Sequence, residues 1–323
     1  MFEVKKQEDT QARERNETRD SPPAPARAAV ILNDSSGTGD KEQARERLAE
    51  IFSETGVEAR ISLARGGDEI VELAQRAVSD NCQPIVAGGG DGTINAVASV
   101  LAGTDRTLGV LPLGTLNHFA KDLHIPLDLE GAARVTLEGR EARVDVGEVE
   151  GRIFLNNSSL GLYPSIVRHR EKQQERLGRG KWPAFLWATL TMLKRYPFLN
   201  VRLSTDDERL IRHTPFVFVG NNEYEMESFN VGARSCIDAG RLSLYVAHRT
   251  GRLGLLRLAW RALFGGLRDE QDFDALCTTE VFIETRRPKR LRVATDGEVA
   301  IMTTPLHYRV RPGALRVLVP KEQ

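Results

Sequence analysis

Residues 88–93, with the sequence Gly-Gly-Gly-Asp-Gly-Thr, combine the residue types that bind phosphate groups. They lie between the apolar run 84–86, which predicts a buried strand, and residues 94–101, whose apolar positions predict a helix. Glycine lets other groups approach the backbone closely, and the first N–H groups of a helix are unpaired at the positive end of its dipole. This junction therefore predicts a phosphate site.

Asp91 places a negative charge among these glycines, and that charge alone would repel a phosphate group. A Mg²⁺ ion between the carboxylate and the phosphates removes the conflict, because proteins often hold Mg²⁺ with one or two carboxylates and substrate phosphates. Asp91 is therefore the predicted metal-linked carboxylate. The alternative is that Asp91 only caps the following helix.

A second acidic group, Asp296-Gly297-Glu298, follows the predicted strand 290–295. Two acids on either side of a glycine can converge on one point, and phosphoryl transfer to an alcohol needs a proton acceptor within hydrogen-bond reach. From the residues alone, a β-turn with two solvated acids is the favoured interpretation, because Asp-Gly is common in turns.

Other signatures of phosphoryl transfer are missing from the sequence. It has neither a Gly-Lys-Ser/Thr P-loop nor the His-Arg-Asp set of protein kinases, so Mg²⁺, backbone N–H groups and Lys121 would have to meet the phosphate charge. The histidines show no metal-binding spacing, and the 3 cysteines are too scattered for a disulfide framework. Lys+Arg and Asp+Glu both number 45, so net charge predicts no partner.

The first half of the chain alternates strands and helices, which predicts a parallel sheet with crossover helices. Three of its strands end in turns rich in Gly, Ser, Thr and Asn, and such turns meet at the carboxyl edge of the sheet, where ligands bind. The expected strands are 28–32, 59–63, 84–86 and 107–111, the helices 41–55, 69–78 and 94–101, and the three turns 33–39, 88–93 and 114–117.

After about residue 140 the pattern changes to short strands separated by turn residues, which predicts a mostly antiparallel β domain. Two helical insertions, 165–194 and 251–267, place basic residues beside aromatic ones. Such segments suit an anionic bilayer interface, although an ordinary amphipathic core helix is the favoured interpretation for either alone. The expected strands are 142–149, 152–157, 201–204, 216–220, 241–247, 279–284, 290–295, 306–310 and 314–319.

At this point the chain resembles the diacylglycerol kinase catalytic-domain superfamily, in its bacterial soluble lipid kinase branch, with sphingosine kinases as relatives. The resemblance covers about residues 28–320. It is carried by Gly-Gly-Asp-Gly-Thr at 89–93, Leu-Pro-Leu-Gly-Thr-Leu-Asn-His-Phe-Ala-Lys at 111–121 and Asp-Gly-Glu at 296–298. The first motif also occurs in NAD kinases and phosphofructokinases, whereas the second is more specific to lipid kinases.

The resemblance implies an α/β plus β fold, with an N-terminal Rossmann-like nucleotide-binding domain and a C-terminal antiparallel β-sandwich domain whose last strands return to the first domain. We expect a disordered tail at 1–26, the nucleotide-binding domain at 27–140, the lipid-substrate domain at 141–305 and the returning strands at 306–323. The active site would lie between the two domains.

The resemblance also implies ATP and Mg²⁺ as cofactors. It implies Asp91, Asp296 and Glu298 as catalytic residues, with Glu298 slightly preferred as the proton acceptor. The residues expected to contact the nucleotide are Asn33, Ser35, Ser36, Gly37, Gly39, Gly89, Gly90, Asp91, Gly92, Thr93, Asn95, Gly114, Thr115 and Asn117.

The chain departs from the family pattern at three places. His118 stands where the family usually has Asp, and Lys121 where Arg is common. In Ile237-Asp238-Ala239-Gly240, Ala239 occupies a position where a carboxylate tends to support a structural metal ion. Asp238, next to it, is the remaining candidate ligand for that second metal.

We therefore predict an ATP-dependent lipid kinase that transfers the γ-phosphoryl group to a hydroxyl of diacylglycerol or a related lipid. The alternatives are an NAD kinase-like or other small-alcohol kinase, and a catalytically silent nucleotide-binding regulator. No apolar run is long enough to span a bilayer, so we expect a cytoplasmic protein that meets its lipid at a membrane surface. No nucleic-acid partner is expected, and a homodimer is left open.

Overall fold

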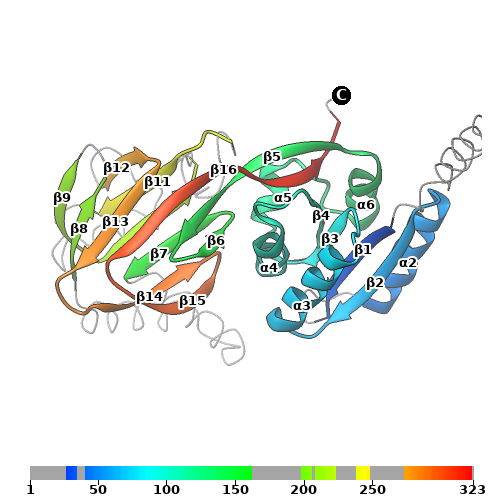
Figure 1. The fold of residues 1–323 in the computed structure, drawn as a ribbon, viewed down its shortest axis with the longest axis horizontal. Helices are drawn as coiled ribbons and strands as arrows, with labels where there is room; N and C mark the ends of the chain where they lie inside the picture. Colours follow the sequence, from blue (N-terminus) through cyan, green and yellow to red (C-terminus); the bar gives the residue numbers. More distant parts are fainter. Residues whose placement is uncertain are drawn as a thin grey trace, which may run out of the picture.

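The computed structural model describes residues 27–34, 41–161, 198–205, 208–222, 238–247 and 273–321. They form two halves joined by two long strands (Figure 1). The predicted tail at 1–26 and the predicted insertions at 165–194 and 251–267 lie outside these residues. Within the described part of the chain, no helix has the length and apolarity needed to cross a bilayer.

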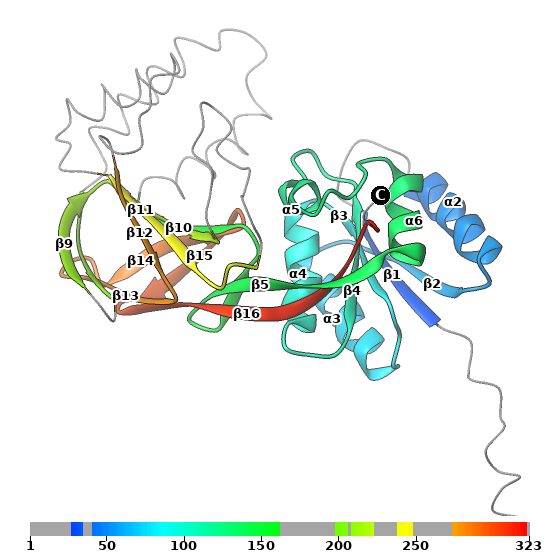
Figure 2. The same cartoon turned by 90° about the horizontal axis from the view of Figure 1, so that it is seen from above.

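The first half is a parallel sheet covered by helices, with the strand order β2-β1-β3-β4. Its apolar strand residues, such as Ile31, Val86 and Leu108, are buried because helices cover the sheet: α3 packs with α4, and α2 packs with α6 (Figure 2). The elements are β1 (Arg27–Asn33), α2 (Lys41–Glu54), β2 (Glu58–Ala64), α3 (Gly67–Ser79), β3 (Ile85–Gly89), α4 (Asp91–Leu101), β4 (Thr107–Pro112), α5 (His118–Asp122) and α6 (Leu129–Glu138).

The second half is a sandwich of two antiparallel layers. A six-stranded sheet in the order β12-β11-β10-β7-β14-β15 packs on the layer β16-β13-β8-β9, and Val219 and Val293 of one layer share a core with Val201 and Ile283 of the other. The elements are β5 (Arg140–Val149), β6 (Arg152–Phe154), β7 (Asn157–Gly161), β8 (Leu199–Ser204), β9 (Arg209–Thr214), β10 (Phe216–Asn221), β11 (Leu242–Ala247), β12 (Phe273–Thr278), β13 (Glu280–Thr285), β14 (Arg290–Thr295), β15 (Glu298–Thr303) and β16 (Leu306–Val319).

Strands β5 and β16 run antiparallel to each other from one half to the other (Figure 1). The start of β16 pairs with β13 in the sandwich, and its end pairs in parallel with β4 in the first half. The predicted return of the C-terminal strands is therefore confirmed. Because both strands pass between the halves, the domain borders at residues 140 and 305 stay predictions.

The predicted fold class is confirmed, but several elements differ from expectation. Residues 152–157 are not one strand: 152–154 form the whole of β6, the chain bends at Leu155 and Asn156, and β7 begins at Asn157. The two expected final strands are one strand, β16, whose register with β5 shifts between Arg311 and Leu315. Sequence analysis did not predict α5, α6, β9, β12 or β15.

Candidate functional site

The glycine-rich segment forms the expected strand-to-helix junction, with β3 ending at Gly89 and α4 beginning at Asp91. A Cβ on Gly89 would overlap the side chain of Thr93, and a Cβ on Gly114 would overlap the Cα of Gly90. The turns after β3 and β4 therefore touch backbone to backbone, which only glycine permits. Around Gly92, by contrast, the space is open.

Hydrogen bonds hold the neighbouring turns against this junction. Asn33 Nδ2, at the end of β1, donates to Thr93 Oγ1 at 2.9 Å. Asn117 has a left-handed backbone, with a φ of 51°, and its Oδ1 accepts the N–H of Gly114 at 3.1 Å. The structure thus brings Asn33, residues 89–93, Gly114 and Asn117 together at one sheet edge, as expected. Ser35, Ser36, Gly37 and Gly39 lie outside the described residues.

Asp91 does not act as a helix cap, so that alternative is wrong. The N-cap residue of α4 is Gly90, and Asp91 is the first helical residue. Its Oδ1 accepts the N–H of Phe119 at 3.2 Å, which joins α4 to α5, while its Oδ2 makes no hydrogen bond with a described residue. One carboxylate oxygen beside an open helix N-terminus fits a Mg²⁺ ion that also contacts phosphate oxygens.

Two further predicted contact residues differ in exposure. Asn95 is buried in α4, and its Oδ1 has no hydrogen-bond partner among the described residues. Burying an amide oxygen without a hydrogen bond costs folding free energy. A water or a ligand group that donates to Asn95 Oδ1 would remove that cost. Thr115 is exposed at the tip of the turn after β4, and Lys121, at the next helix, is also exposed.

In the second half, Asp296 and Gly297 form the two-residue turn of the β14–β15 hairpin. Their φ values of 46° and 90° are those of the type I′ turn that Asp-Gly favours. The Asp296 carboxylate accepts three backbone N–H groups, from Leu155 at 2.6 Å, Asn156 at 2.9 Å and Asn157 at 3.0 Å. The predicted β-turn is therefore confirmed. The expectation that Asp296 is solvated is wrong, because its carboxylate is bonded to the backbone.

The strand that supplies Asn157 is itself fixed to this hairpin. Ser158 Oγ, on β7, donates to the carbonyl of Ala294 on β14 at 2.9 Å and lies 3.0 Å from the hydroxyl of Tyr308. Burial raises the pKa of the Tyr308 phenol, and the Ser158 hydrogen bond opposes that shift only in part. The hairpin therefore rests on a buried, neutral hydrogen-bonded pair.

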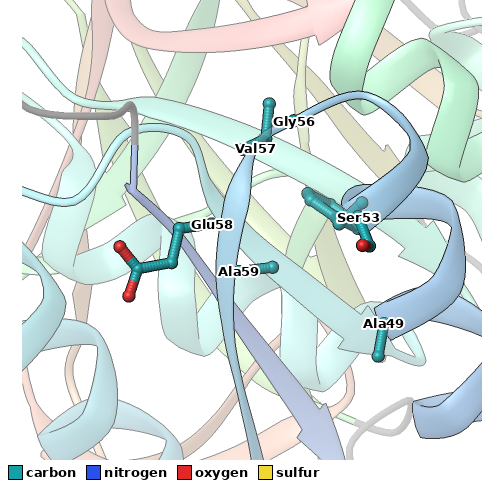
Figure 3. Close-up of a pocket in the computed structure, with 7 residues that line it drawn as sticks. Ala49, Ser53, Gly56, Val57, Glu58 and Ala59 are labelled. Atoms are coloured by element: carbon teal, nitrogen blue, oxygen red, sulfur yellow. The ribbon is translucent and has the colours of Figure 1, made fainter.

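Glu298, the first residue of β15, is exposed and has no ion pair among the described residues. It lines a cavity of about 260 Å³ together with Asn33, Gly90, Gly92 and Thr93, and with Gly67 and Ile70 of α3. The structure therefore places an acid of the second half opposite the glycine turn of the first. A larger cavity of about 370 Å³ lies between α2 and β2 (Figure 3), and none of its lining residues belongs to either turn.

Asp238 is exposed before β11 and is not among the residues that line this cavity. The neighbouring Gly240 donates its N–H to Asp145 Oδ2 at 2.6 Å, and Gly313 donates to Asp145 Oδ1 at 2.8 Å. In the described ranges no three acidic, histidine or cysteine side chains gather as a metal site, and a metal at Asp238 stays a prediction. Sequence analysis missed Asp145, whose only signal is a charge inside the apolar strand 144–149.

Comparisons with known proteins match both halves of the chain. Residues 27–149 match the family described as the diacylglycerol kinase catalytic domain, and residues 165–319 match the YegS C-terminal NAD kinase beta sandwich-like domain. Two proteins named diacylglycerol kinase, from Staphylococcus aureus strains RF122 / ET3-1 and MRSA252, are each 38% identical over 141 residues. That stretch covers 42% of this chain and 44% of each relative, so less than half of either protein is matched.

Solved structures resemble nearly the whole fold. The crystal structure of a diacylglycerol kinase from Bacillus anthracis strain Sterne aligns with a TM-score of 0.68 at 21% identity. A second structure from that strain aligns with a TM-score of 0.72 at 24% identity. Each alignment covers 91% of this chain and 97% of the other, which shows that the fold is shared.

Proposed function

This chain belongs to the diacylglycerol kinase catalytic-domain superfamily, and from that membership we propose that it is an ATP-dependent lipid kinase. The proposed reaction transfers the γ-phosphoryl group of ATP to a hydroxyl of diacylglycerol or a related lipid. The nucleotide would lie on the turns after β1, β3 and β4, and the lipid hydroxyl would approach from the β14–β15 hairpin.

The observation that carries this proposal is the cavity shared by Glu298 and the glycine turn. More than 200 residues separate Glu298 from Gly90 in the chain. An acid opposite a phosphate cradle is the arrangement in which a hydroxyl could lose its proton while it attacks a phosphoryl group. A site for nucleotide binding alone would not need an acid facing the phosphates.

The two acids of the hairpin take different roles in this proposal. Both oxygens of Asp296 are occupied by the N–H groups of residues 155–157, so this side chain is a positioning residue that fixes the turn. Glu298 has no such bonds among the described residues and is exposed to the cavity. We therefore assign proton acceptance to Glu298.

On the nucleotide side, the residues of the first half would bind and orient the phosphates. The open N–H groups at the start of α4 would donate to phosphate oxygens, and the Asn33–Thr93 hydrogen bond keeps that helix end against β1. Asp91 would hold Mg²⁺, which supplies charge neutralisation when bound. Lys121 is exposed near the same turn and could add a positive charge.

The test measures transfer of radiolabel from ATP to a panel of lipids in mixed micelles. We compare the wild type with Glu298→Gln and Asp91→Asn. Loss of a general base typically costs about 10²–10⁴-fold in rate, so Glu298→Gln should lose at least about 100-fold in kcat while still binding ATP. Asp91→Asn should lose activity and also show weaker Mg²⁺-dependent ATP binding.

Two outcomes would reject the proposal in favour of its alternatives. Phosphorylation of a soluble alcohol or of NAD, but of no lipid, would indicate a different acceptor. ATP binding that Asp91→Asn weakens, with no phosphorylated product from the wild type under any condition, would indicate a catalytically silent nucleotide-binding protein. A variant such as Thr303→Ala, at the far end of β15, controls for effects of substitution in this hairpin.

A further inference from the structure

The short segment 155–157, which links β6 to β7, is held from two sides. On one side, its three backbone N–H groups donate to the Asp296 carboxylate, and its last carbonyl accepts the backbone N–H of Asp296 at 2.9 Å. On the other side, its first two carbonyls accept hydrogen bonds from Asn221. Each backbone polar group of the segment therefore has a partner, and two distant residues are enough to supply them.

Asn221, the last residue of β10, makes these contacts from a buried position, with only 1% of its surface exposed. Its backbone N–H donates to the carbonyl of Asn156 at 2.9 Å. Its side-chain Nδ2 donates to the carbonyl of Leu155 at 3.0 Å and to the carbonyl of Asp145, on β5, at 2.9 Å. An amide nitrogen carries two hydrogens, so both are used. The Asn221 side chain therefore bridges the segment 155–157 and β5.

The β5 end of this bridge is connected to the first half. Strands β5 and β16 pass between the halves (Figure 1), and the buried Asp145 carboxylate accepts the N–H of Gly313 at 2.8 Å, where the register of the two strands shifts. The carbonyl of the next residue, Ala314, accepts the N–H of Gly103 at 2.7 Å. Gly103 lies just after α4, the helix that begins at the glycine turn. Hydrogen bonds and backbone thus join the β14–β15 hairpin to that helix through Asn221.

We propose that Asn221 is a positioning residue that sets the place of the β14–β15 hairpin, and so of Glu298, relative to the glycine turn. Asn221 does not line the cavity. It acts through the segment 155–157, which holds Asp296 two residues before Glu298. A misplacement of about 1 Å can cost about 100-fold in rate, so a bridge at this place affects catalysis from a distance. The inference rests on the proposed function, in which Glu298 accepts the proton.

A positioning role differs in one measurable way from a purely structural one. A buried asparagine that only stabilises the fold would change the amount of active enzyme, and so would lower the measured kcat by the same factor whatever residue stands at position 298. A residue that acts through Glu298 loses its effect once the Glu298 carboxylate is gone, because coupled residues are not additive.

The experiment is therefore a double-mutant cycle that combines Asn221→Ala with Glu298→Gln. It measures transfer of radiolabel from ATP to diacylglycerol in mixed micelles. The control is Val217→Ala, a substitution on the same strand whose side chain lies in the sandwich core and whose strand partner on β7 is Leu160. Thermal unfolding verifies that every variant folds.

Asn221→Ala should lower kcat by about 10–100-fold, because the proton acceptor is no longer held in place. The KM for ATP should be unchanged, since the nucleotide would bind on the turns of the first half. In the Glu298→Gln background the same substitution should lower kcat by about twofold at most. Val217→Ala should keep the kcat of its parent in both backgrounds. Equal losses from Asn221→Ala in the two backgrounds would overturn the proposal.

Amide hydrogen exchange tests the bridge without any assay of activity. In the wild type, the N–H groups of residues 155–157 should exchange as slowly as those inside β7. In Asn221→Ala they should exchange about tenfold faster relative to the amides of β8, because the segment loses hydrogen bonds on one side. Val217→Ala should not change this ratio. Fast exchange in the wild type, or an unchanged ratio in Asn221→Ala, would overturn the positioning role.

The two measurements also separate this inference from the proposed function. A wild type that phosphorylates no lipid, but in which Asn221→Ala selectively loosens residues 155–157, would reject the lipid kinase and support the bridge. Lipid phosphorylation together with an additive cycle would reject the positioning role of Asn221 and leave the lipid kinase in place.

Discussion

The turn after β3 and the turn between β14 and β15 face the same cavity but are held by different forces. The first is fixed by contact, because a Cβ on Gly114 would overlap the backbone of Gly90. The second is fixed by charge, because one carboxylate, Asp296, collects three backbone N–H groups. The first should therefore fail when volume is added and the second when charge is removed.

The two turns also share a principle. Each joins a rigid frame to one acid with an oxygen that forms no hydrogen bond with a described residue: Asp91 Oδ2 in the first half and the Glu298 carboxylate in the second. Such preorganised frames around a reactive group lower the cost of positioning it during reaction.

The largest effect should come from Asp296→Asn, which removes the charge that holds the second turn. The amide would present an NH₂ group to backbone donors, so about 3 kcal/mol of the free energy of unfolding should be lost, at 1.5–3 kcal/mol for a hydrogen bond to a charged group. Urea denaturation measures this change. Kinase activity should fall as well, since Glu298 loses its fixed position.

Glu298→Gln is the matched control for that variant, because it makes the same chemical change two residues away. Its side chain is exposed and has no described partner, so the free energy of unfolding should stay within about 0.5 kcal/mol of the wild type. Equal destabilisation by the two substitutions would show that Asp296 does not hold the turn.

Gly114→Ala should produce the next largest effect, through added volume in the first turn. The new Cβ would overlap the Cα of Gly90 and lie 2.9 Å from Asn117 Oδ1. We expect a loss of about 1–3 kcal/mol in unfolding free energy, as for other overpacked sites, together with weaker ATP binding. Gly92→Ala adds the same methyl group where no atom lies within 4 Å, so its stability should be unchanged.

Much of the first half could be predicted from sequence because its signals are local. Apolar runs end in glycine-rich turns, and the carboxyl edge of a parallel sheet brings such turns together whatever their distance in sequence. The contact between Asn33 and residues 88–93 follows from that rule. The hydrogen bond from Phe119 to Asp91 does not, because α5 is only five residues long and has no periodic pattern.

The second half was harder to predict because its pairings are distant. Asp296 reaches residues 155–157 across about 140 positions, and no local pattern marks those N–H groups as its partners. Asp145 similarly joins Gly240 and Gly313. From the Asp-Gly-Glu residues alone, a turn with solvated acids is the favoured interpretation. Only the family resemblance predicts that Asp296 and Glu298 belong to the active site.

Thr93→Val should have a smaller effect than the glycine change. It removes the hydroxyl that accepts from Asn33 but keeps the side-chain shape, so we expect a loss of about 1 kcal/mol in unfolding free energy. The KM for ATP should rise several-fold, because the start of α4 is no longer tied to β1. Thr136→Val removes a buried hydroxyl bonded within α6, and should match the stability loss without changing KM.

The smallest effect at neutral pH involves Tyr308. This residue should make the stability of the second half depend on alkaline pH. Burial raises the pKa of its phenol above the ordinary value near 10, so the unfolded chain releases this proton at a lower pH than the folded chain. The stability from this group is complete below pH about 10 and falls by roughly 1.4 kcal/mol per pH unit above it. In Tyr308→Phe the free energy of unfolding should no longer fall in this way above pH about 10, as measured by urea denaturation across pH.

Ser158→Ala is the control, because it removes the hydrogen-bond partner but keeps the phenol. The fall of the unfolding free energy at alkaline pH should therefore persist in this variant. If it vanished there as well, the titrating group would have to lie elsewhere.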